Sequence, residues 1–223
     1  MKIAIIDSGV HAAHPHVRGV AGGVGIDDHG ALHDDCVDRL GHGTAVTAVI
    51  REKAPTADIW AVKVFDRELR ATGAALVAAL RWARAEGMDM VNLSLGTTNS
   101  DHEHALGEEV RGAREDGVLI VAAAPEADRR WLPGALPGVV RVELDLSMSR
   151  EVCEFVDDAD GALIVRASGY PRPIPGVPPE RNLKGLSFAV ANATGFLANL
   201  WPEWPPQLLL RNAGAARGIN RLH

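Results

Sequence analysis

The sequence predicts an α/β protein in which a mostly parallel central sheet is covered by helices on both faces. Short apolar stretches, typical of strands buried on both faces, alternate along the chain with segments of helical pattern. In one of these segments, residues 72–86, Leu76 and Leu80 share one face while Arg81 lies off it. With 223 residues, 47% of them hydrophobic, the chain is long enough to bury a full core.

Local signals place the individual elements along the chain. The apolar run 2–6 predicts a buried strand that Asp7 closes at its carboxyl end, where reacting groups collect in open α/β sheets. Gly41 and Gly43 allow a tight backbone before a helical stretch, and Gly185 precedes a second helix rich in small residues. The expected strands are 2–6, 58–65, 89–94, 118–123, 138–144 and 162–166, and the expected helices are 43–53, 72–86, 102–116, 187–200 and 205–213.

Composition limits the class of protein. Residues 1–223 are expected to form one domain, because no repeat or low-complexity tract marks a second. The net charge of −6 and the lack of a basic stripe argue against nucleic-acid binding. No apolar run approaches the roughly 18 residues of a membrane span, and no signal peptide or propeptide is evident. We therefore expect a cytoplasmic protein that does not bind membranes.

The two cysteines do not imply a disulfide. Cys36 and Cys153 lie far apart in the sequence, so a bridge between them is compatible with the chain but not required. We expect both thiols to be free and Cys153 to be a core residue.

Three short segments carry an acid, a base and a nucleophile in the order Asp7, His42, Ser187. Ser187 opens a predicted helix, where free N–H groups and the helix dipole favour developing negative charge. A catalytic triad has this division of labour: the serine attacks, the histidine takes and returns the proton, and the aspartate orients the imidazole. Taken alone, Asp7 and Ser187 are more often cap or turn residues and His42 is more often structural or solvated, but the three segments together predict a serine hydrolase.

The chain resembles the subtilisin-like serine proteases, or subtilases, along nearly its whole length. The implied fold is the three-layer subtilisin-like fold, here in a short form, with Asp7, His42 and Ser187 as catalytic residues. The resemblance implies a peptide or protein substrate and no metal or other cofactor; structural calcium is compatible with it but not implied. The matching segments are Asp7-Ser8-Gly9 with His14-Pro15, His42-Gly43-Thr44-Ala45-Val46, residues 54–64, 91–96 and 118–124, and Gly185-Leu186-Ser187-Phe188-Ala189.

The same resemblance implies a substrate-binding crevice. Ser94, Leu95 and Gly96 would offer extended backbone to a peptide, which pairs as an added strand. Ala123 and Ala124 would form the opposite wall of the primary pocket. Trp131 replaces a small residue of the family at the pocket floor, which predicts a shallow pocket and a small residue before the cleaved bond. The alternative is that Trp131 packs over the sheet edge.

The chain departs from the family pattern at the oxyanion site. After the strand that ends near Ala124 the family continues Gly-Asn, whose amide donates to the oxyanion, whereas this chain reads Pro125-Glu126. The Ser187 backbone N–H remains, and losing one donor typically costs about 10² to 10³ in rate. Three interpretations stay open: Glu126 donates when protonated in a buried apolar setting, it points to solvent, or the site is slow or inactive.

Two further segments have compositions that are compatible with a functional role. Residues 27–38 concentrate acids and imidazoles, which is compatible with a metal site, a solvated loop, or an acidic rim that attracts basic side chains, but the spacing fits no zinc or EF-hand template. The proline-rich segment 170–179 is expected to be a stiff surface loop, with docking of a substrate or partner as the alternative.

The leading interpretation is a serine endopeptidase with a narrow processing role in the cytoplasm, such as leader removal from a precursor peptide. One alternative is an acyl-transferring peptide ligase or cyclase that uses the same triad. Another is a catalytically impaired peptide-binding protein of the same fold. The intact triad favours an enzyme, while Pro125-Glu126 and Leu186, where the family commonly has Thr, favour the binding protein.

Overall fold

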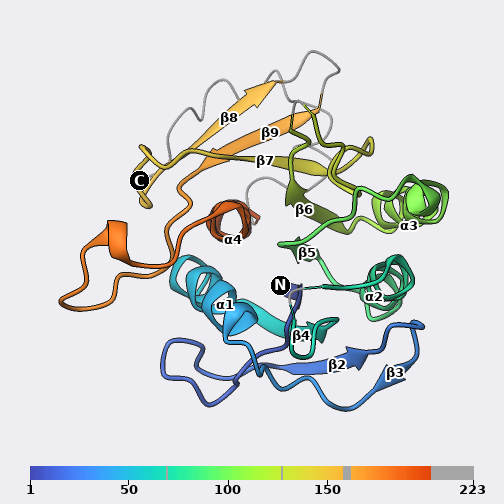
Figure 1. Cartoon of the computed structure of the whole chain (residues 1–223), viewed down its shortest axis with the longest axis horizontal. Coiled ribbons are helices and arrows are strands. Elements are labelled where there is room, and N and C mark those ends of the chain that lie inside the picture. Colours follow the sequence, from blue (N-terminus) through green and yellow to red (C-terminus); the bar gives the residue numbers. More distant parts are fainter. Residues whose placement is uncertain (69, 127, 158–161, 202–223) are drawn as a thin grey trace.

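The computed structural model describes residues 1–68, 70–126, 128–157 and 162–201. Within them, one nine-stranded sheet forms the middle layer, and its strands follow the order β3-β2-β4-β1-β5-β6-β7-β9-β8 (Figure 1). The pairings from β2 through β4, β1, β5, β6 and β7 to β9 are parallel, and the outermost pairs, β2–β3 and β8–β9, are antiparallel. The expected α/β class with a mostly parallel sheet is therefore confirmed.

The strands that the apolar runs predicted form the inner part of this sheet. Their burial on both faces explains why each one reads as a nearly continuous hydrophobic run. In the described residues, the complete sheet consists of β1 (Lys2–Asp7), β2 (Gly22–Ile26), β3 (Leu32–His33), β4 (Asp58–Lys63), β5 (Met90–Leu93), β6 (Leu119–Ala123), β7 (Val140–Leu144), β8 (Cys153–Asp157) and β9 (Leu163–Ala167).

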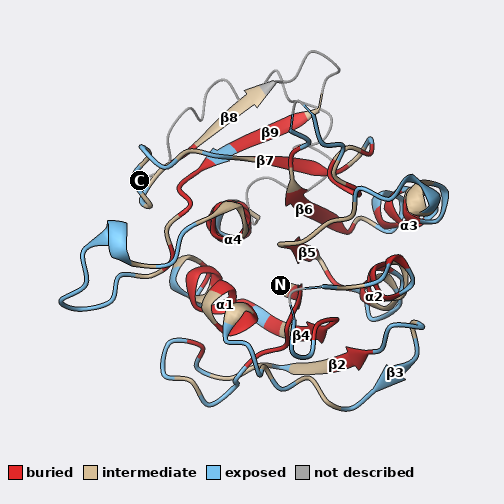
Figure 2. Cartoon of the chain, in the orientation of Figure 1, coloured by how far each residue is buried: buried red, intermediate tan, exposed pale blue. Residues whose placement is uncertain are grey.

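Helices cover both faces of the sheet. The helices α1 (His42–Lys53) and α4 (Leu186–Leu200) pack on one face, and α2 (Gly73–Ala85) and α3 (Glu103–Glu115) pack on the other. Figure 2 shows that each helix turns a buried side toward the sheet. In the described part of the chain, no helix is both long and apolar enough to cross a bilayer.

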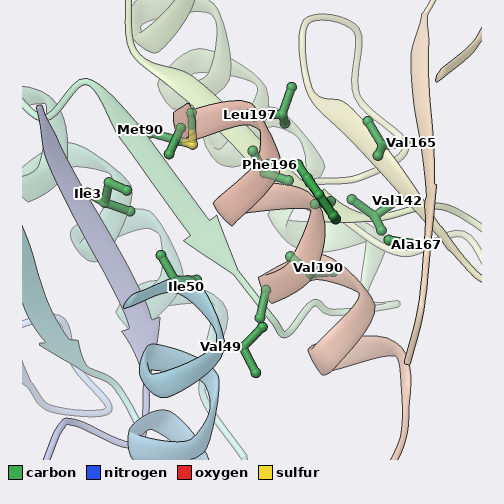
Figure 3. Packing of buried hydrophobic residues seen from close by; sticks show 14 of the residues in the cluster. Ile3, Val49, Ile50, Met90, Val142, Val165, Ala167, Val190, Phe196 and Leu197 are labelled. Carbon is green, nitrogen blue, oxygen red and sulfur yellow. The ribbon is translucent and has the colours of Figure 1, made fainter. Parts of the chain in front are cut away.

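Helix α4 is the most deeply buried helix. Every residue from Phe188 to Ala198 is buried, which explains its lack of charged side chains. Val190 and Phe196 of α4 belong to the same core cluster as Val49 and Ile50 of α1 (Figure 3). The two helices thus lie side by side on one face, which brings the site segments at their N-termini to one edge of the sheet.

The order of the strands also positions the site. β1 lies between β4 and β5, and the chain reaches those two strands through helices on opposite faces. Such a topological switch point opens a crevice beyond the carboxyl ends of the strands. Asp7 ends β1, and Ser94 follows β5 directly, so both residues lie at this edge.

Several elements differ from the sequence expectation. β2, β3 and β8 were not predicted, because β2 is glycine-rich, β3 has only two residues, and β8 mixes polar and apolar residues. Cys153 at the start of β8 is fully buried, as expected, and both cysteines are free. Within the proline-rich segment 170–179, residues 173–179 are exposed, as expected of a surface loop, whereas Pro171 is buried. The helix expected over 205–213 lies outside the described residues.

The contribution of α4 to stability can be measured with a matched pair of substitutions. Leu197 is fully buried in the core beside α1, whereas Leu32 is 57% exposed on β3. We expect Leu197→Ala to lower the free energy of unfolding by about 2–5 kcal/mol, through lost burial and the remaining cavity. Leu32→Ala should change it by no more than about 0.5 kcal/mol. Urea unfolding measures both, and equal losses would contradict the packing described here.

Candidate active site

Asp7 and His42 form a buried carboxylate–imidazole pair. Asp7 Oδ1 lies 2.7 Å from His42 Nδ1 and also accepts a hydrogen bond of 2.7 Å from Ser8 N. An ionised carboxylate can only accept, so His42 Nδ1 carries a proton and its Nε2 is left as the acceptor. Asp7 is fully buried, whereas the His42 side chain is 19% exposed. The hydrogen bond at Nδ1 therefore orients the imidazole, and part of the ring remains exposed to solvent.

A close backbone approach sets this pair. Gly43, the second residue of α1, lies so near the end of β1 that an added Cβ would meet the Gly9 carbonyl oxygen at 2.2 Å. The same Cβ would lie 3.2 Å from Asp7 Oδ1. Only glycine allows α1 to begin this close to Asp7, because the nearest of these atoms, the Gly9 carbonyl oxygen, cannot move aside without shifting backbone.

Ser187 is the second residue of α4, where the first backbone N–H groups of a helix lack intrahelical partners. The next residue, Phe188, has its ring centroid 6.0 Å from that of His42, so the start of α4 faces the imidazole. In the described residues, the Ser187 hydroxyl donates to the Ser94 carbonyl at 3.2 Å and makes no hydrogen bond to His42. Nucleophile–base hydrogen bonds are often loose without substrate, so the catalytic roles of Asp7, His42 and Ser187 stay a prediction.

A buried chain of hydrogen bonds, which the sequence did not reveal, holds the segment beside Ser187. Thr194 Oγ1 in α4 donates to Asn92 Oδ1 in β5 at 3.0 Å, and Asn92 Nδ2 donates to Ser94 Oγ at 2.8 Å. Ser94 Oγ in turn donates to the Ser187 carbonyl at 3.4 Å. Thr194 and Asn92 are fully buried, so this chain ties the middle of α4 to the end of β5. Thr194, a polar residue among the small residues of α4, was the sequence signal for this chain of hydrogen bonds.

The residues expected to bind substrate lie at or just beyond the carboxyl ends of β5 and β6, which are neighbours in the sheet. Ser94, Leu95 and Gly96 follow β5 and are partly exposed, and Ala123 ends β6 two strands from β1. The segment that begins at Trp131 lies between these two walls. It pairs with the first wall through Thr97 and Leu132 and reaches the second at Gly134, where an added Cβ would lie 1.8 Å from the Ala123 oxygen.

Trp131 lies against the segment after β5. Its ring atom Cε3 is 3.5 Å from the position of an added Cβ on Gly96, and the side chain is partly buried. Its Nε1 is buried without a hydrogen-bond partner in the described residues. This location is compatible with the pocket floor. The role of Trp131 in specificity stays a prediction, as do the roles of the other crevice residues.

Among the described residues at the end of the opposite wall, no side chain is an evident oxyanion donor. Ala124 is buried and donates its N–H to the Val142 carbonyl at 2.9 Å, whereas Pro125 and Glu126 are exposed. The Glu126 backbone pairs with that of Arg129 in both directions. A protonated Glu126 donor needs a buried, apolar setting, and the exposed side chain does not have one. The geometry agrees better with the alternative in which Glu126 points to solvent.

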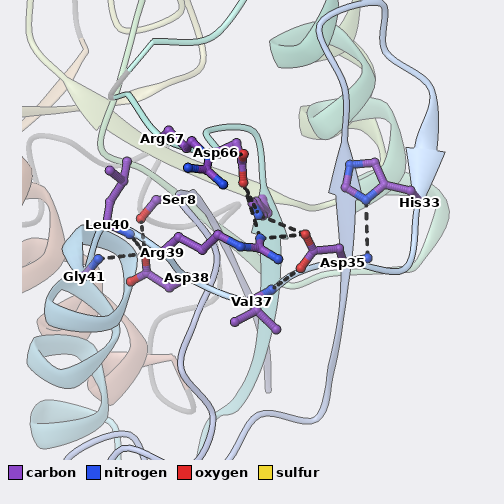
Figure 4. Close-up of polar contacts among 11 residues, drawn as sticks. Ser8, His33, Asp35, Val37, Asp38, Arg39, Leu40, Gly41, Asp66 and Arg67 are labelled. Atoms are coloured by element: carbon purple, nitrogen blue, oxygen red, sulfur yellow. Dashed lines mark hydrogen bonds and ion pairs between the residues drawn. The ribbon is translucent and has the colours of Figure 1, made fainter.

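The acidic segment 27–38 is occupied by internal contacts. Asp35 and Asp66 both bind the nearly buried Lys63 ammonium, at 3.1 and 2.9 Å, and both contact the Arg39 guanidinium (Figure 4). This ion-pair group, Asp35, Arg39, Lys63 and Asp66, lines an open pocket of about 740 Å³. Its two acids and two bases neutralise one another. In the described residues, no group of three His, Cys, Asp or Glu side chains is arranged to hold a metal ion.

The electrostatics of the site raise the pKa of His42. Burial of the imidazole opposes its charged form, but the hydrogen bond and charge of Asp7 and the charge of Asp38 outweigh burial. The pKa of His42 therefore lies above its ordinary value of 6.5. A histidine with this shift takes up a proton more readily than one in water, as a general base requires.

This shift predicts a pH-dependent contribution to stability. A folded-state pKa above the unfolded value stabilises the protein below the unfolded pKa of about 6.5, and this stabilisation is lost as pH rises through the folded-state pKa. We expect His42→Gln to lower the free energy of unfolding more at about pH 5 than at about pH 9. His104→Gln, on the exposed side of α3, is the matched control. Equal pH dependence of the two variants in urea unfolding would contradict the raised pKa.

Comparisons with known proteins agree with this architecture. A profile of the family described as Peptidase_S8, Subtilase family, matches residues 1–138. The major intracellular serine protease of Bacillus subtilis (strain 168) is 30% identical over 220 residues, which cover 89% of this chain and 67% of that protein. A thermostable alkaline protease of Halalkalibacterium halodurans is 32% identical over 152 residues, 63% of this chain, and the chain spans only 40% of that protein's length.

Solved structures share the fold at low sequence identity. The prenylagaramide maturation protease PagA superimposes with a TM-score of 0.68 at 23% identity, over 95% of this chain and 81% of that one. This likeness supports the fold alone, and the expected subtilisin-like fold is confirmed by it. From the profile match over more than half of its length, the chain belongs to the subtilase family.

Proposed function

We propose that this chain is a serine endopeptidase that cleaves a peptide bond through an acyl-enzyme on Ser187. The observation that carries the proposal is the buried 2.7 Å pair of Asp7 and His42 beside the N-terminus of α4. Relatives that are proteases by name, from the same family, support the chemistry. The activity of this chain is itself a proposal, because it spans less than half of some of those relatives.

In the proposed reaction, Ser187 Oγ attacks the substrate carbonyl carbon and its proton moves to His42 Nε2. His42 then gives this proton to the leaving amine as the peptide bond breaks. Water, deprotonated by His42, then attacks the acyl carbon; the bond to Ser187 Oγ breaks, His42 returns the proton to Oγ, and the second product leaves. Asp7 stays ionised and stabilises the imidazolium that forms in each half-reaction. Before attack, the Ser187 hydroxyl has to leave the Ser94 carbonyl and turn toward His42.

The negative oxygen that forms during attack would lie at the N-terminus of α4. There the Ser187 N–H and the helix dipole favour the charge. The exposed Glu126 does not add a donor, so we expect slow turnover compared with a site that has two donors. Slow turnover suits a narrow processing role better than bulk digestion. Leader removal from a precursor peptide and a cytoplasmic location both stay predictions, as does acyl transfer to an amine in place of water.

The competing function is a peptide-binding protein of the same fold. The observation that favours it is the hydrogen bond of the Ser187 hydroxyl to Ser94, which leaves the hydroxyl turned away from the base. Labelling with a fluorophosphonate probe separates the two functions, because the probe reacts only with an activated serine hydroxyl.

We expect wild-type protein to be labelled at neutral pH, Ser187→Ala to lose all labelling, and His42→Ala to lose nearly all of it without unfolding. Ser149→Ala, at an exposed serine remote in sequence from the triad residues, is the matched control and should label like wild type. Intact-mass spectrometry measures the adduct, and circular dichroism checks the fold. Folded wild-type protein that takes no label would support the binding protein instead.

Pocket depth gives a second prediction. If Trp131 closes the floor beside Gly96, removing its ring opens space for a larger side chain before the cleaved bond. In a matched peptide series, we expect Trp131→Gly to raise the ratio of kcat/KM for Leu over Ala at that position by about tenfold. Trp131→Phe keeps a ring at the floor and should change the ratio far less. An unchanged ratio in Trp131→Gly would mean that Trp131 packs away from the pocket.

A further inference from the structure

We propose that Asp38 is a positioning residue for His42: it holds the imidazole in place through the first turn of α1 and places a fixed negative charge near that ring. Asp38 lies in the acidic segment 27–38, whose composition is compatible with a metal site, a solvated loop or an acidic rim. The inference rests on the proposed function, in which His42 is the general base.

The Asp38 carboxylate accepts hydrogen bonds on both oxygens. Oδ1 accepts from Ser8 Oγ at 2.9 Å, from Leu40 N at 2.9 Å and from Gly41 N at 2.8 Å (Figure 4). Oδ2 accepts from the backbone N–H of Thr44 at 2.9 Å and from the Thr44 hydroxyl. Five donors occupy the lone pairs that a carboxylate offers, which leaves no place for a proton.

These contacts replace a missing helix cap. The N-cap residue of α1 is Gly41, which has a left-handed backbone with φ of 85° and no side chain to accept the free N–H groups of the first turn. Asp38 reaches over from three residues upstream and accepts the N–H of Thr44, the third residue of the helix. Its negative charge also lies at the positive end of the helix dipole. His42 begins this helix, so its backbone position depends on the cap.

The same carboxylate connects α1 to the strand that carries Asp7. Ser8, which follows Asp7, donates its hydroxyl hydrogen to Asp38 and accepts the Gly43 N–H at 2.9 Å. The Thr44 hydroxyl, which donates to Asp38, accepts the N–H of His11 at 3.0 Å. Asp38 therefore bridges both partners of the Asp7–His42 pair through their immediate chain neighbours.

The charge of Asp38 acts on His42 as well. Among the described residues, the groups that act on the imidazole are Asp7 from β1, Asp38 from the loop before α1, and the uncharged Phe188 ring from α4. Burial works against an ionised Asp38, but its hydrogen bonds from Thr44, Gly41 and Leu40 outweigh burial and lower its pKa. Asp38 thus stays ionised at neutral pH. Its fixed negative charge favours the imidazolium that forms when Ser187 loses its proton.

The test measures the pKa of His42 directly by NMR titration of its ring protons in Ser187→Ala protein, which requires no turnover. We expect Asp38→Asn to move the midpoint to lower pH. Asp34→Asn removes the same charge from an exposed side chain that makes no hydrogen bond in the described residues, and it should leave the midpoint in place. If Asp38→Asn does not fold, Asp38→Ser keeps a capping oxygen without the charge and gives the same readout.

Activity supplies an independent readout in the protein with Ser187 intact. We expect Asp38→Asn to lower kcat/KM at neutral pH by about tenfold, as for a lost hydrogen bond to a charged group, and to move the acid limb of the pH profile to lower pH. A loss of activity with the NMR midpoint and acid limb unchanged would overturn the proposal and make Asp38 purely structural. A midpoint that shifts in a protein without fluorophosphonate labelling would support Asp38 while refuting the proposed peptidase.

Discussion

The candidate site depends on a contact between two stretches of backbone. The first turn of α1 lies against the loop after β1 with no side chain between them, because Gly43 occupies the point of closest approach. A methyl group at position 43 would push α1 outward and carry His42 away from Asp7. The hydrogen bond between His42 Nδ1 and Asp7 Oδ1, at 2.7 Å, would then be lengthened. The Ser8 hydroxyl stabilises this contact, because it accepts the Gly43 N–H and donates to Asp38.

The second half of the site depends on the burial of α4. This helix has no charged side chain and packs against both α1 and the sheet, which fixes the position of its N-terminus relative to the strand ends. The segment after β5 is tied to it by the Thr194–Asn92–Ser94 chain of hydrogen bonds. Packing and polar contacts therefore place Ser187 and His42 at one edge, each in the first turn of a helix, without a direct bond between them.

Much of this arrangement could be predicted from the sequence, because the inner strands are buried on both faces and leave apolar runs. The helix starts at His42 and Leu186 were readable from the glycines that precede them. The edge strands could not be predicted from the sequence, since β3 has only two residues and β8 mixes polar and apolar residues.

Interactions that cross between segments could not be predicted either. Asp38 is indistinguishable in sequence from its acidic neighbours, and its capping role appears only when α1 and Ser8 are placed around it. The direction of Glu126 was likewise left open by the sequence. It depends on the turn that its backbone makes with Arg129, a residue with no local signal of pairing.

The short length of the edge strand β3 disfavours self-association of the protein through its sheet. At that rim the sheet ends in Leu32 and His33 alone, so a second molecule finds almost no free backbone with which to continue the sheet. The segment after β5, where peptide binding is proposed, lies away from this rim, near the middle of the sheet. The short edge at β3 therefore disfavours association of two copies through their sheets at that rim, and it does so without restricting the proposed crevice.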